Sequence, residues 1–368
     1  MNNHFFDIGH NSMFIILGQA CNLQCKYCLK HTMVNQQLAA EPSEKLLDYL
    51  EYIIKTRNES FFITFYGGEP LLYFETIKRI KEYCDDKEKE FDKKILNYGI
   101  ISNAKALTQE ITDWVSENNI SFTVSYDGYN SIQTRGFDPI KEKEELLLQI
   151  PNLNLSAVVT SANYPLDILN AFQEFNDKYF DKHNKHTGIN LDELMDTGCG
   201  IETQDLLDIN QDRYNENIKA ILDSYIEAIK TKKTDLSITE QWGEMLVNRM
   251  MGAKEAPNKA LRLSKCKQTL NVLNVDLEGN IYSCHNSTEE NLGTITDQTN
   301  SVVEKLISSE YNIMHRRRTL CDRCEAEYIC QGGCKLISDE RITTTCKLKK
   351  GVIPTIKDAL IKILEVTK

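Results

Sequence analysis

The sequence predicts an α/β protein built on a parallel β-sheet and followed by a cysteine-rich module. Two observations support this fold class. Across about the first two hundred of the 368 residues, short apolar segments alternate with amphipathic segments of helical spacing, which is the pattern of successive βα units. From Cys266 onward this periodicity fades, and seven of the twelve cysteines lie between residues 266 and 346.

Five strands and several helices are expected from these patterns. The strands are the short apolar runs at residues 14–17, 61–65, 96–101, 121–125 and 155–159. The helices between them, several with Ser, Thr or Pro near the start, are expected at residues 43–55, 75–87, 108–117 and 166–178. Further along the chain, residues 210–252 predict one or two helices, and residues 354–366 predict a final helix.

Polar residues or glycines follow each of the first four strands. They are a cysteine loop at 21–28, the Gly-Gly-Glu-Pro run at 67–70, Ser102 with Asn103, and the Ser-Tyr-Asp-Gly run at 125–128. The carboxyl ends of parallel strands share one edge of a sheet, and ligands bind at that edge. These four segments therefore predict one binding site.

Composition limits the partners and the compartment. The chain has 43 Lys and Arg against 54 Asp and Glu, a formal charge of −11, which argues against nucleic acid as a partner. The N-terminus lacks the features of a signal peptide and no segment approaches about 18 apolar residues, so a cytoplasmic protein without membrane contact is expected. Thiols stay reduced there, so the clustered cysteines predict metal ligands rather than disulfides.

Cys21, Cys25 and Cys28 form a C-x3-C-x2-C triplet directly after an apolar run. Three thiolates on a four-iron, four-sulfur cluster leave one iron open to a ligand that is not protein. The C-x2-C pair alone leaves zinc and iron–sulfur equally open. The full spacing, with Tyr27 before the last cysteine and a strand before the first, resembles the signature of the radical S-adenosylmethionine (SAM) superfamily.

Further positions match that family in the same order along the chain. The resemblance implies that the Gly-Gly-Glu-Pro turn presents backbone to the methionine amino group, a task for which glycine is suited because it has no Cβ. It also implies ribose contacts at the end of the third strand and a methionine carboxylate site near the fourth. Taken singly, each position also fits an ordinary turn or cap. The positions predicted to bind SAM are Tyr27, Gly67, Gly68, Glu69, Pro70, Ser102, Asn103, Ser125 and Arg135.

The C-terminal cysteines form a second pattern. It reads C-x12-G-x4-C from Cys266 through Gly279 to Cys284, then C-x2-C-x5-C-x3-C from Cys321, and ends at Cys346. The pattern resembles the SPASM domain, an extension of radical SAM enzymes, although a zinc ribbon is the alternative for the four central cysteines. The resemblance implies two auxiliary clusters and three 4Fe–4S clusters in all. The ligands would be Cys321, Cys324, Cys330 and Cys346 for one auxiliary cluster, and Cys266, Cys284 and Cys334 for the other.

Together the two resemblances imply a partial (β/α)6 TIM-like barrel with a C-terminal iron–sulfur (SPASM) domain. The expected division is a radical SAM barrel at 1–205, a helical bridge at 206–258, an auxiliary-cluster domain at 259–350 and a C-terminal helix at 351–368. The Cys266 set is one thiolate short, so Cys199 or a substrate thiolate is expected to complete it.

His285 is the predicted catalytic base. The similar anaerobic sulfatase-maturing enzymes have an aspartate after the cysteine matching Cys284, and this chain has His285 there. Histidine accepts a proton near neutral pH. The alternative is a surface histidine in a cysteine loop.

The expected function is radical modification of a peptide or protein side chain, by a thioether or C–C crosslink or by oxidation, as in the maturation of ribosomal peptides. Formylglycine formation in sulfatases and a small-molecule dehydrogenase are the alternatives within enzymes. A zinc-stabilised binding module is the alternative outside them. The expected partners are an electron donor such as flavodoxin or ferredoxin and, because the chain starts close to its first strand, a separate leader-recognition protein.

Overall fold

The computed structural model describes residues 5–29, 41–196, 203–252, 272–308, 321, 324–326, 330, 333–334 and 336–367. Its centre is one nine-stranded sheet of order β6-β5-β4-β3-β2-β1-β7-β8-β9. Six strands follow one another in chain order, each parallel to the next: β1 (Ser12–Ile16), β2 (Phe61–Tyr66), β3 (Leu96–Ser102), β4 (Ser121–Ser125), β5 (Leu153–Val159) and β6 (Gly188–Glu193). The five predicted strands are present and the parallel α/β fold is confirmed. The sixth strand, β6, was missed because its sequence is poor in apolar residues.

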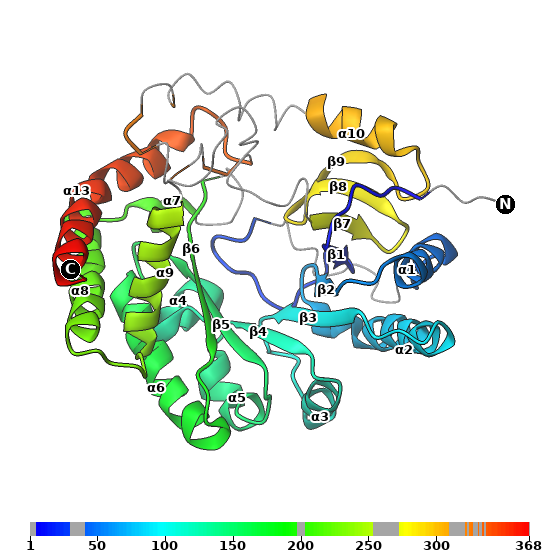
Figure 1. Ribbon diagram of the computed structural model, residues 1–368, viewed down its shortest axis with the longest axis horizontal. Helices are drawn as coiled ribbons and strands as arrows, with labels where there is room; N and C mark the ends of the chain where they lie inside the picture. The colour runs from blue at the N-terminus through cyan, green and yellow to red at the C-terminus, as the bar shows by residue number, and fades with distance from the viewer. Residues whose placement is uncertain are drawn as a thin grey trace.

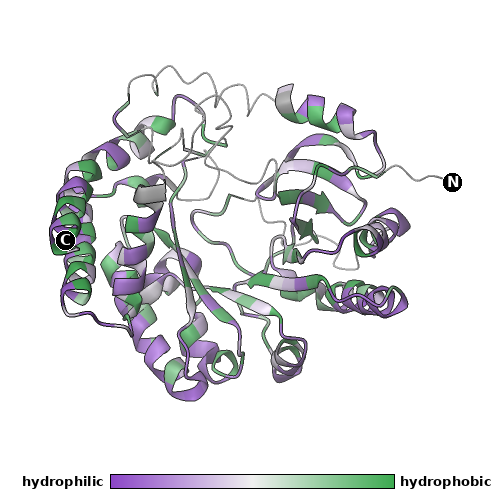
Figure 2. Cartoon of the chain, viewed as in Figure 1, coloured by the Kyte–Doolittle hydropathy of each residue, from purple (hydrophilic) through white to green (hydrophobic). Residues whose placement is uncertain are grey.

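Helices cover the outside of this curved sheet (Figure 1). They are α1 (Glu44–Thr56), α2 (Phe74–Glu90), α3 (Gln109–Glu117), α4 (Ser131–Arg135), α5 (Pro139–Leu147) and α6 (Pro165–His183), with short 3-10 turns η1 (Pro70–Tyr73) and η2 (Gly128–Asn130). Ser43 and Thr108 cap α1 and α3 by accepting a backbone N–H with the side-chain oxygen. The helices are amphipathic, and their hydrophobic residues gather against the sheet (Figure 2).

The two faces of the parallel strands differ in chemistry. Met13, Ile15, Ile63 and Phe65 are fully buried against the helices. We call the opposite face the inner face. It carries half-buried or exposed residues, many of them polar, at the alternate positions: Phe14, Thr64, Tyr66, Asn97, Thr123, Ser125, Ser156, Asn190 and Asp192. Because side chains alternate along a strand, one face builds the core and the other is left for a ligand.

The sheet continues into the cysteine-rich part of the chain. β7 (Val272–Asp276) pairs in parallel with β1, and β8 (Asn280–Cys284) and β9 (Ser287–Thr294) add antiparallel strands. Leu273, Val275 and Ile281 are buried in the same core as the first six strands. The sheet therefore crosses the boundary predicted at 258/259. These short strands gave too weak a periodic signal among the turns to be recognised from sequence.

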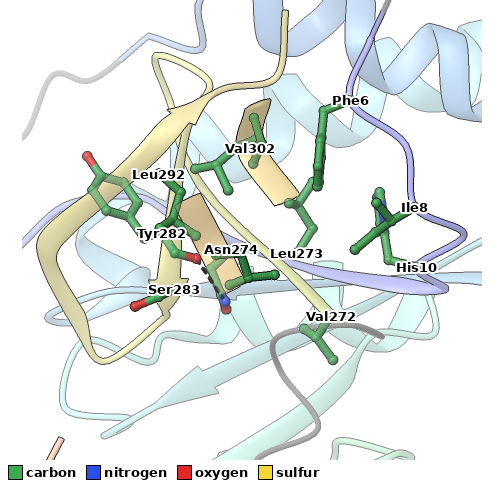
Figure 3. Close-up of a pocket in the computed structure, with 12 residues that line it drawn as sticks. Phe6, Ile8, His10, Val272, Leu273, Asn274, Tyr282, Ser283, Leu292 and Val302 are labelled. Atoms are coloured by element: carbon green, nitrogen blue, oxygen red, sulfur yellow. Dashed lines mark hydrogen bonds between the residues drawn. The ribbon is translucent and has the colours of Figure 1, made fainter. Parts of the chain in front are cut away.

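The N-terminal segment packs on these added strands (Figure 3). Phe6 donates its N–H to the Ile295 carbonyl at 2.9 Å, and His10 Nε2 lies 2.9 Å from the Tyr49 hydroxyl. His10 is 1% exposed, and burial lowers the pKa of its imidazole to about 4. His10 and Asn274 both line a small cavity of about 20 Å³.

The remaining helices form a layer beside β6. They are α7 (Thr203–Leu207), α8 (Gln211–Lys230), α9 (Ile238–Gly252) and α13 (Ile342–Val366), whereas α10 (Thr299–Ser308) lies beside β9 at the other end of the sheet. α13 begins at Ile342, twelve residues before the predicted start, and it contains Pro354. It packs on α8 so closely that a Cβ on Gly351 would overlap the Gln211 side chain. None of the helices in the described ranges combines the length and apolar composition needed to cross a membrane.

Candidate active site

The cysteine loop leaves the carboxyl end of β1. Cys21 is buried, and Cys25 and Cys28 are half-buried. The Cys21 Sγ accepts N–H groups from Leu23 at 3.4 Å and from the Asn103 side chain at 3.7 Å. Burial, together with the nearby Glu69, Cys25 and Cys28, raises the pKa of the Cys21 thiol to about 11, although the hydrogen bond from Leu23 lowers it. The three thiols are thus close neighbours, and a bound metal cluster would have to displace their protons.

The Gly-Gly-Glu-Pro turn holds this loop in place. Gly68 and Glu69 donate their backbone N–H groups to the carbonyls of Gly18 and Ala20 at 2.9 and 2.8 Å. A Cβ on Gly67 would lie 2.5 Å from the Gly18 oxygen, and a Cβ on Gly68 would overlap the Ala20 oxygen. Glycine is therefore required at both positions by the closeness of the loop, and the prediction that this turn meets the methionine amino group stays a prediction.

Glu69 ties the ends of β2 and β3 together. Its carboxylate accepts hydrogen bonds from the Ser102 hydroxyl at 2.6 Å and from the backbone N–H groups of Asn103 and Leu71 at 2.8 and 3.0 Å. Burial raises the pKa of this carboxyl, and the three hydrogen bonds act in the opposite direction. Pro70 follows it and begins η1.

The side chains of Ser102 and Asn103 have different hydrogen-bond partners. Ser102 is 1% exposed and its hydroxyl is bound to Glu69. The Asn103 amide instead reaches the cysteine loop, donating to the Asn22 side chain at 2.9 Å. Their predicted ribose contacts remain predictions, but Asn103 lies directly beside Cys21.

Tyr27, Asp127 and Arg135 form a buried network behind the loop. The Tyr27 hydroxyl donates to Asp127 Oδ2 at 2.5 Å and accepts from Arg135 Nη1 at 2.6 Å. Asp127 is 0% exposed and also accepts from the Thr134 hydroxyl at 2.7 Å. Asp127 is not among the positions that the sequence predicted to bind SAM. Ser125, two residues earlier, is half-buried at the end of β4.

A cavity of about 350 Å³ opens beside Cys21. Two cationic side chains, Lys105 and Arg135, line it together with the loop residues 22–24 and Gly136. Cationic groups beside thiolate ligands suit a cofactor that carries a carboxylate. The structure therefore brings the predicted cysteine loop and Arg135 to one cavity, and adds Lys105, which the sequence did not single out.

His285 lies against the inner face of β1 and β2. Its ring stacks on Phe14 with centroids 4.2 Å apart and meets the edge of Tyr66 at 4.6 Å. The Tyr66 hydroxyl donates to the Asn286 side chain at 2.7 Å. Burial raises the pKa of Tyr66, and the nearby Cys28 and Cys284 raise it further. Tyr66 therefore connects β2 to the two residues that follow Cys284, a contact that the sequence did not predict.

A repeated local geometry surrounds three of the cysteines predicted as cluster ligands. In each case the sulfur accepts the backbone N–H of the residue two positions later at 3.4 Å: Cys21 from Leu23, Cys284 from Asn286, and Cys334 from Leu336. Hydrogen bonds to sulfur stabilise thiolate charge and help to set cluster potentials. These residues fit iron–sulfur ligation.

The other C-terminal cysteines are only partly described. Cys321, Cys324 and Cys330 are half-buried, and Cys346 lies in the first turns of α13. Cys266 and Cys199 lie outside the described residues. Among the residues described, no three His, Cys, Asp or Glu side chains are arranged to hold a single metal ion. The predicted grouping of the C-terminal ligands stays a prediction.

A parallel α/β sheet with three cysteines in the loop after its first strand, backed by a Gly-Gly-Glu-Pro turn, defines a radical SAM fold. Residues 15–196 match the radical SAM superfamily model, so this part of the chain is a radical SAM domain and the protein is a radical SAM enzyme. Membership implies SAM and one 4Fe–4S cluster as cofactors, and the family predicted from the cysteine motif is confirmed.

The relatives extend this assignment over the chain. The radical SAM cyclopropyl synthase TigE of Paramaledivibacter caminithermalis is 24% identical over 377 residues, covering 95% of this chain and 73% of TigE. The cysteine-type anaerobic sulfatase-maturating enzyme of Clostridium novyi is 27% identical over 124 residues, covering 31% of this chain and 32% of that enzyme.

A solved structure matches the whole fold. Native anSMEcpe with bound AdoMet superposes with a TM-score of 0.67 at 18% identity, covering 97% of this chain and all of that chain. A second structure of anSMEcpe, with AdoMet and the Cp18Cys peptide, gives 0.65 at 18% identity and covers 97% and 99%. The likeness shows a shared fold that includes the cysteine-rich C-terminal part.

Proposed function

We propose that this enzyme modifies a side chain of a peptide or protein and forms a carbon–carbon bond there. The observation that carries the proposal is the ring cluster at the inner face of the sheet, where His285, the residue after Cys284, stacks on Phe14 and meets the edge of Tyr66. The peptide-bound relative of the same fold and the cyclopropyl synthase that aligns with 95% of the chain support the substrate class and the bond type. The broader proposal, modification of a peptide side chain, also includes a thioether crosslink or an oxidation.

The cofactor site is proposed at the cysteine loop. Cys21, Cys25 and Cys28 would hold the 4Fe–4S cluster, with Asn103 beside Cys21 and the cations Lys105 and Arg135 facing the cavity. When bound, the cluster and SAM would supply the radical chemistry that removes a hydrogen atom from the substrate. The C-terminal cysteines would hold two auxiliary clusters, which supply one-electron redox chemistry when bound.

The chain's own residues would position the substrate and accept its proton. The inner face between the cysteine loop and β8 offers the stacked rings of Phe14 and His285, and the Tyr66–Asn286 hydrogen bond fixes the edge of this platform. Forming a bond with loss of two hydrogens removes one as a hydrogen atom and the other as a proton, and the remaining electron would pass to an auxiliary cluster. We assign the proton-accepting role to His285, because an imidazole can act as a general base.

Formylglycine formation is less well supported. The match to the sulfatase-maturating enzyme covers 31% of the chain, whereas the match to TigE covers 95%. His285 also stands where the similar sulfatase-maturing enzymes have an aspartate. We further propose a cytoplasmic location, a flavodoxin or ferredoxin as electron donor, and a separate protein that recognises the substrate leader.

Co-expression under anaerobic conditions with short peptides encoded beside the gene, followed by mass spectrometry, tests the function. We expect the peptide to lose two hydrogens, and Cys25→Ala to abolish the change. His285→Gln should retain SAM cleavage to 5′-deoxyadenosine but lose most of the product. No mass change with deuterium uptake would instead indicate epimerisation and would refute bond formation.

Metal analysis tests the cluster assignment separately. Ten cysteines holding three clusters predict about twelve irons per chain by the four-iron stoichiometry. Zinc without iron in anaerobically reconstituted protein would contradict the assignment of these cysteines as iron–sulfur ligands and, with it, the proposed radical activity. About four irons would leave the first cluster in place and refute the two auxiliary clusters.

A further inference from the structure

Asp127 is a buried carboxylate near the cysteine loop that accepts three hydrogen bonds, and the family resemblance assigned it no role. Besides Tyr27 and Thr134, it accepts the backbone N–H of Val158 from β5 with Oδ1 at 3.1 Å. Its own N–H is bound by the Ser131 hydroxyl at 2.9 Å. A carboxylate with this many partners and no exposed surface is held in one position.

The network connects Asp127 to the cysteine loop at two points. The Tyr27 hydroxyl donates to Asp127 Oδ2 at 2.5 Å. The backbone N–H of Lys26 donates to the Thr134 carbonyl at 3.0 Å, while the Thr134 side chain binds Asp127. Asp127 thus fixes residues 26 and 27, which lie between Cys25 and Cys28.

Arg135 brings a positive charge to the same place. Its Nη1 binds the Tyr27 hydroxyl and lies 3.9 Å from Asp127 Oδ1, and its side chain is 11% exposed. Arg135 also lines the cavity beside Cys21. The cysteine loop therefore has one positive and one negative side chain beside it, Arg135 and Asp127.

We propose that Asp127 is a positioning residue that fixes the cysteine loop through Tyr27 and, by offsetting the charge of Arg135, sets the reduction potential of the cluster on that loop. The inference rests on the proposed ligands Cys21, Cys25 and Cys28. Reduction adds one electron to the cluster and makes it more negative. A nearby positive charge favours the reduced state and a nearby negative charge opposes it. In a protein, unit charges about 10 Å apart change such an equilibrium by about tenfold.

The test is a redox titration of the anaerobically reconstituted enzyme without SAM, followed by electron paramagnetic resonance. Asp127→Asn leaves Arg135 uncompensated and should increase the ratio of reduced to oxidised cluster about tenfold at a fixed solution potential, a shift of ~59 mV for one electron. Arg135→Gln should decrease the ratio to a similar extent. The double variant should return close to the wild-type value because both charges are gone.

Glu88→Gln is the matched control. Glu88 is a carboxylate 7% exposed that accepts backbone N–H groups from Ile95 and Leu96 at 2.6 and 2.8 Å, at the end of β3 opposite to the cysteine loop. Its replacement should leave the potential unchanged. If Asp127→Asn fails to load a cluster, the Arg135→Gln variant alone decides the test. The reduction potential of its cluster must then fall below the wild-type value.

The outcomes separate this inference from the proposed function. Shifts of the same sign in both single variants, or no shift, would overturn the charge-compensation role while leaving the enzyme class intact. Absence of a reducible 4Fe–4S signal in the wild-type enzyme would instead refute the proposed cluster itself. Opposite shifts that cancel in the double variant are not expected from a residue that only supports the fold.

Discussion

Gly68 is the position where one added methyl group should displace the cysteine loop. A Cβ there would overlap the Ala20 carbonyl oxygen and lie 2.6 Å from that of Gln19. The loop must retreat, and the hydrogen bonds from Gly68 to Gly18 and from Glu69 to Ala20 lengthen or break. Two hydrogen bonds at about 1 kcal/mol each and an overpacking cost of about 1–3 kcal/mol give about 3–5 kcal/mol. That is a large part of a typical domain stability of about 5–15 kcal/mol.

Urea unfolding of reduced, metal-free Gly68→Ala under anaerobic conditions measures this loss, and iron content after reconstitution reports on the adjacent Cys21. We expect both to fall. Gly9→Ala is the control, because Gly9 has a positive φ of 79° but open space around its Cβ position. It should cost only about 1–2 kcal/mol of left-handed strain and keep full iron content. The reasoning would be refuted if Gly68→Ala matched the wild type in unfolding free energy and in iron.

Three further outcomes are expected. The imidazole of His10 titrates at about 4 in the folded state and near 6.5 when unfolded, so the unfolded state binds the extra proton first. Stability should therefore fall by up to ~3 kcal/mol between pH 6.5 and 4. His10→Gln should flatten this dependence in urea titrations, and an unchanged slope would contradict it. Glu69→Gln should lower the free energy of unfolding by about 2 kcal/mol, because an amide NH2 cannot accept the hydrogen bonds that the carboxylate accepts. An unchanged free energy of unfolding would contradict this and show that neighbouring groups rearrange to pair with the amide. Tyr66→Phe removes the 2.7 Å hydrogen bond to Asn286 and should lower the ratio of modified peptide to 5′-deoxyadenosine, with iron content unchanged. An unchanged ratio would show that Tyr66 does not help to position the substrate.

The sequence alone determined the enzyme class and the parallel sheet. The cysteine triplet, the Gly-Gly-Glu-Pro turn and the five apolar strands are local patterns. Each can be recognised within a few consecutive residues. The chemistry of three thiols at this spacing and the period of the strands need no knowledge of distant contacts.

Tertiary structure decided which residues surround the cysteine loop. Tyr27 meets Asp127 across 100 positions of sequence, and Tyr66 meets Asn286 across 220. Neither pairing leaves a periodic or spacing signal, because each depends on how the sheet brings strand ends together. The addition of β7 to β1 likewise became visible only in the folded chain. The sequence alone identified the thiols, and the fold supplied the charges, hydrogen bonds and rings that surround them.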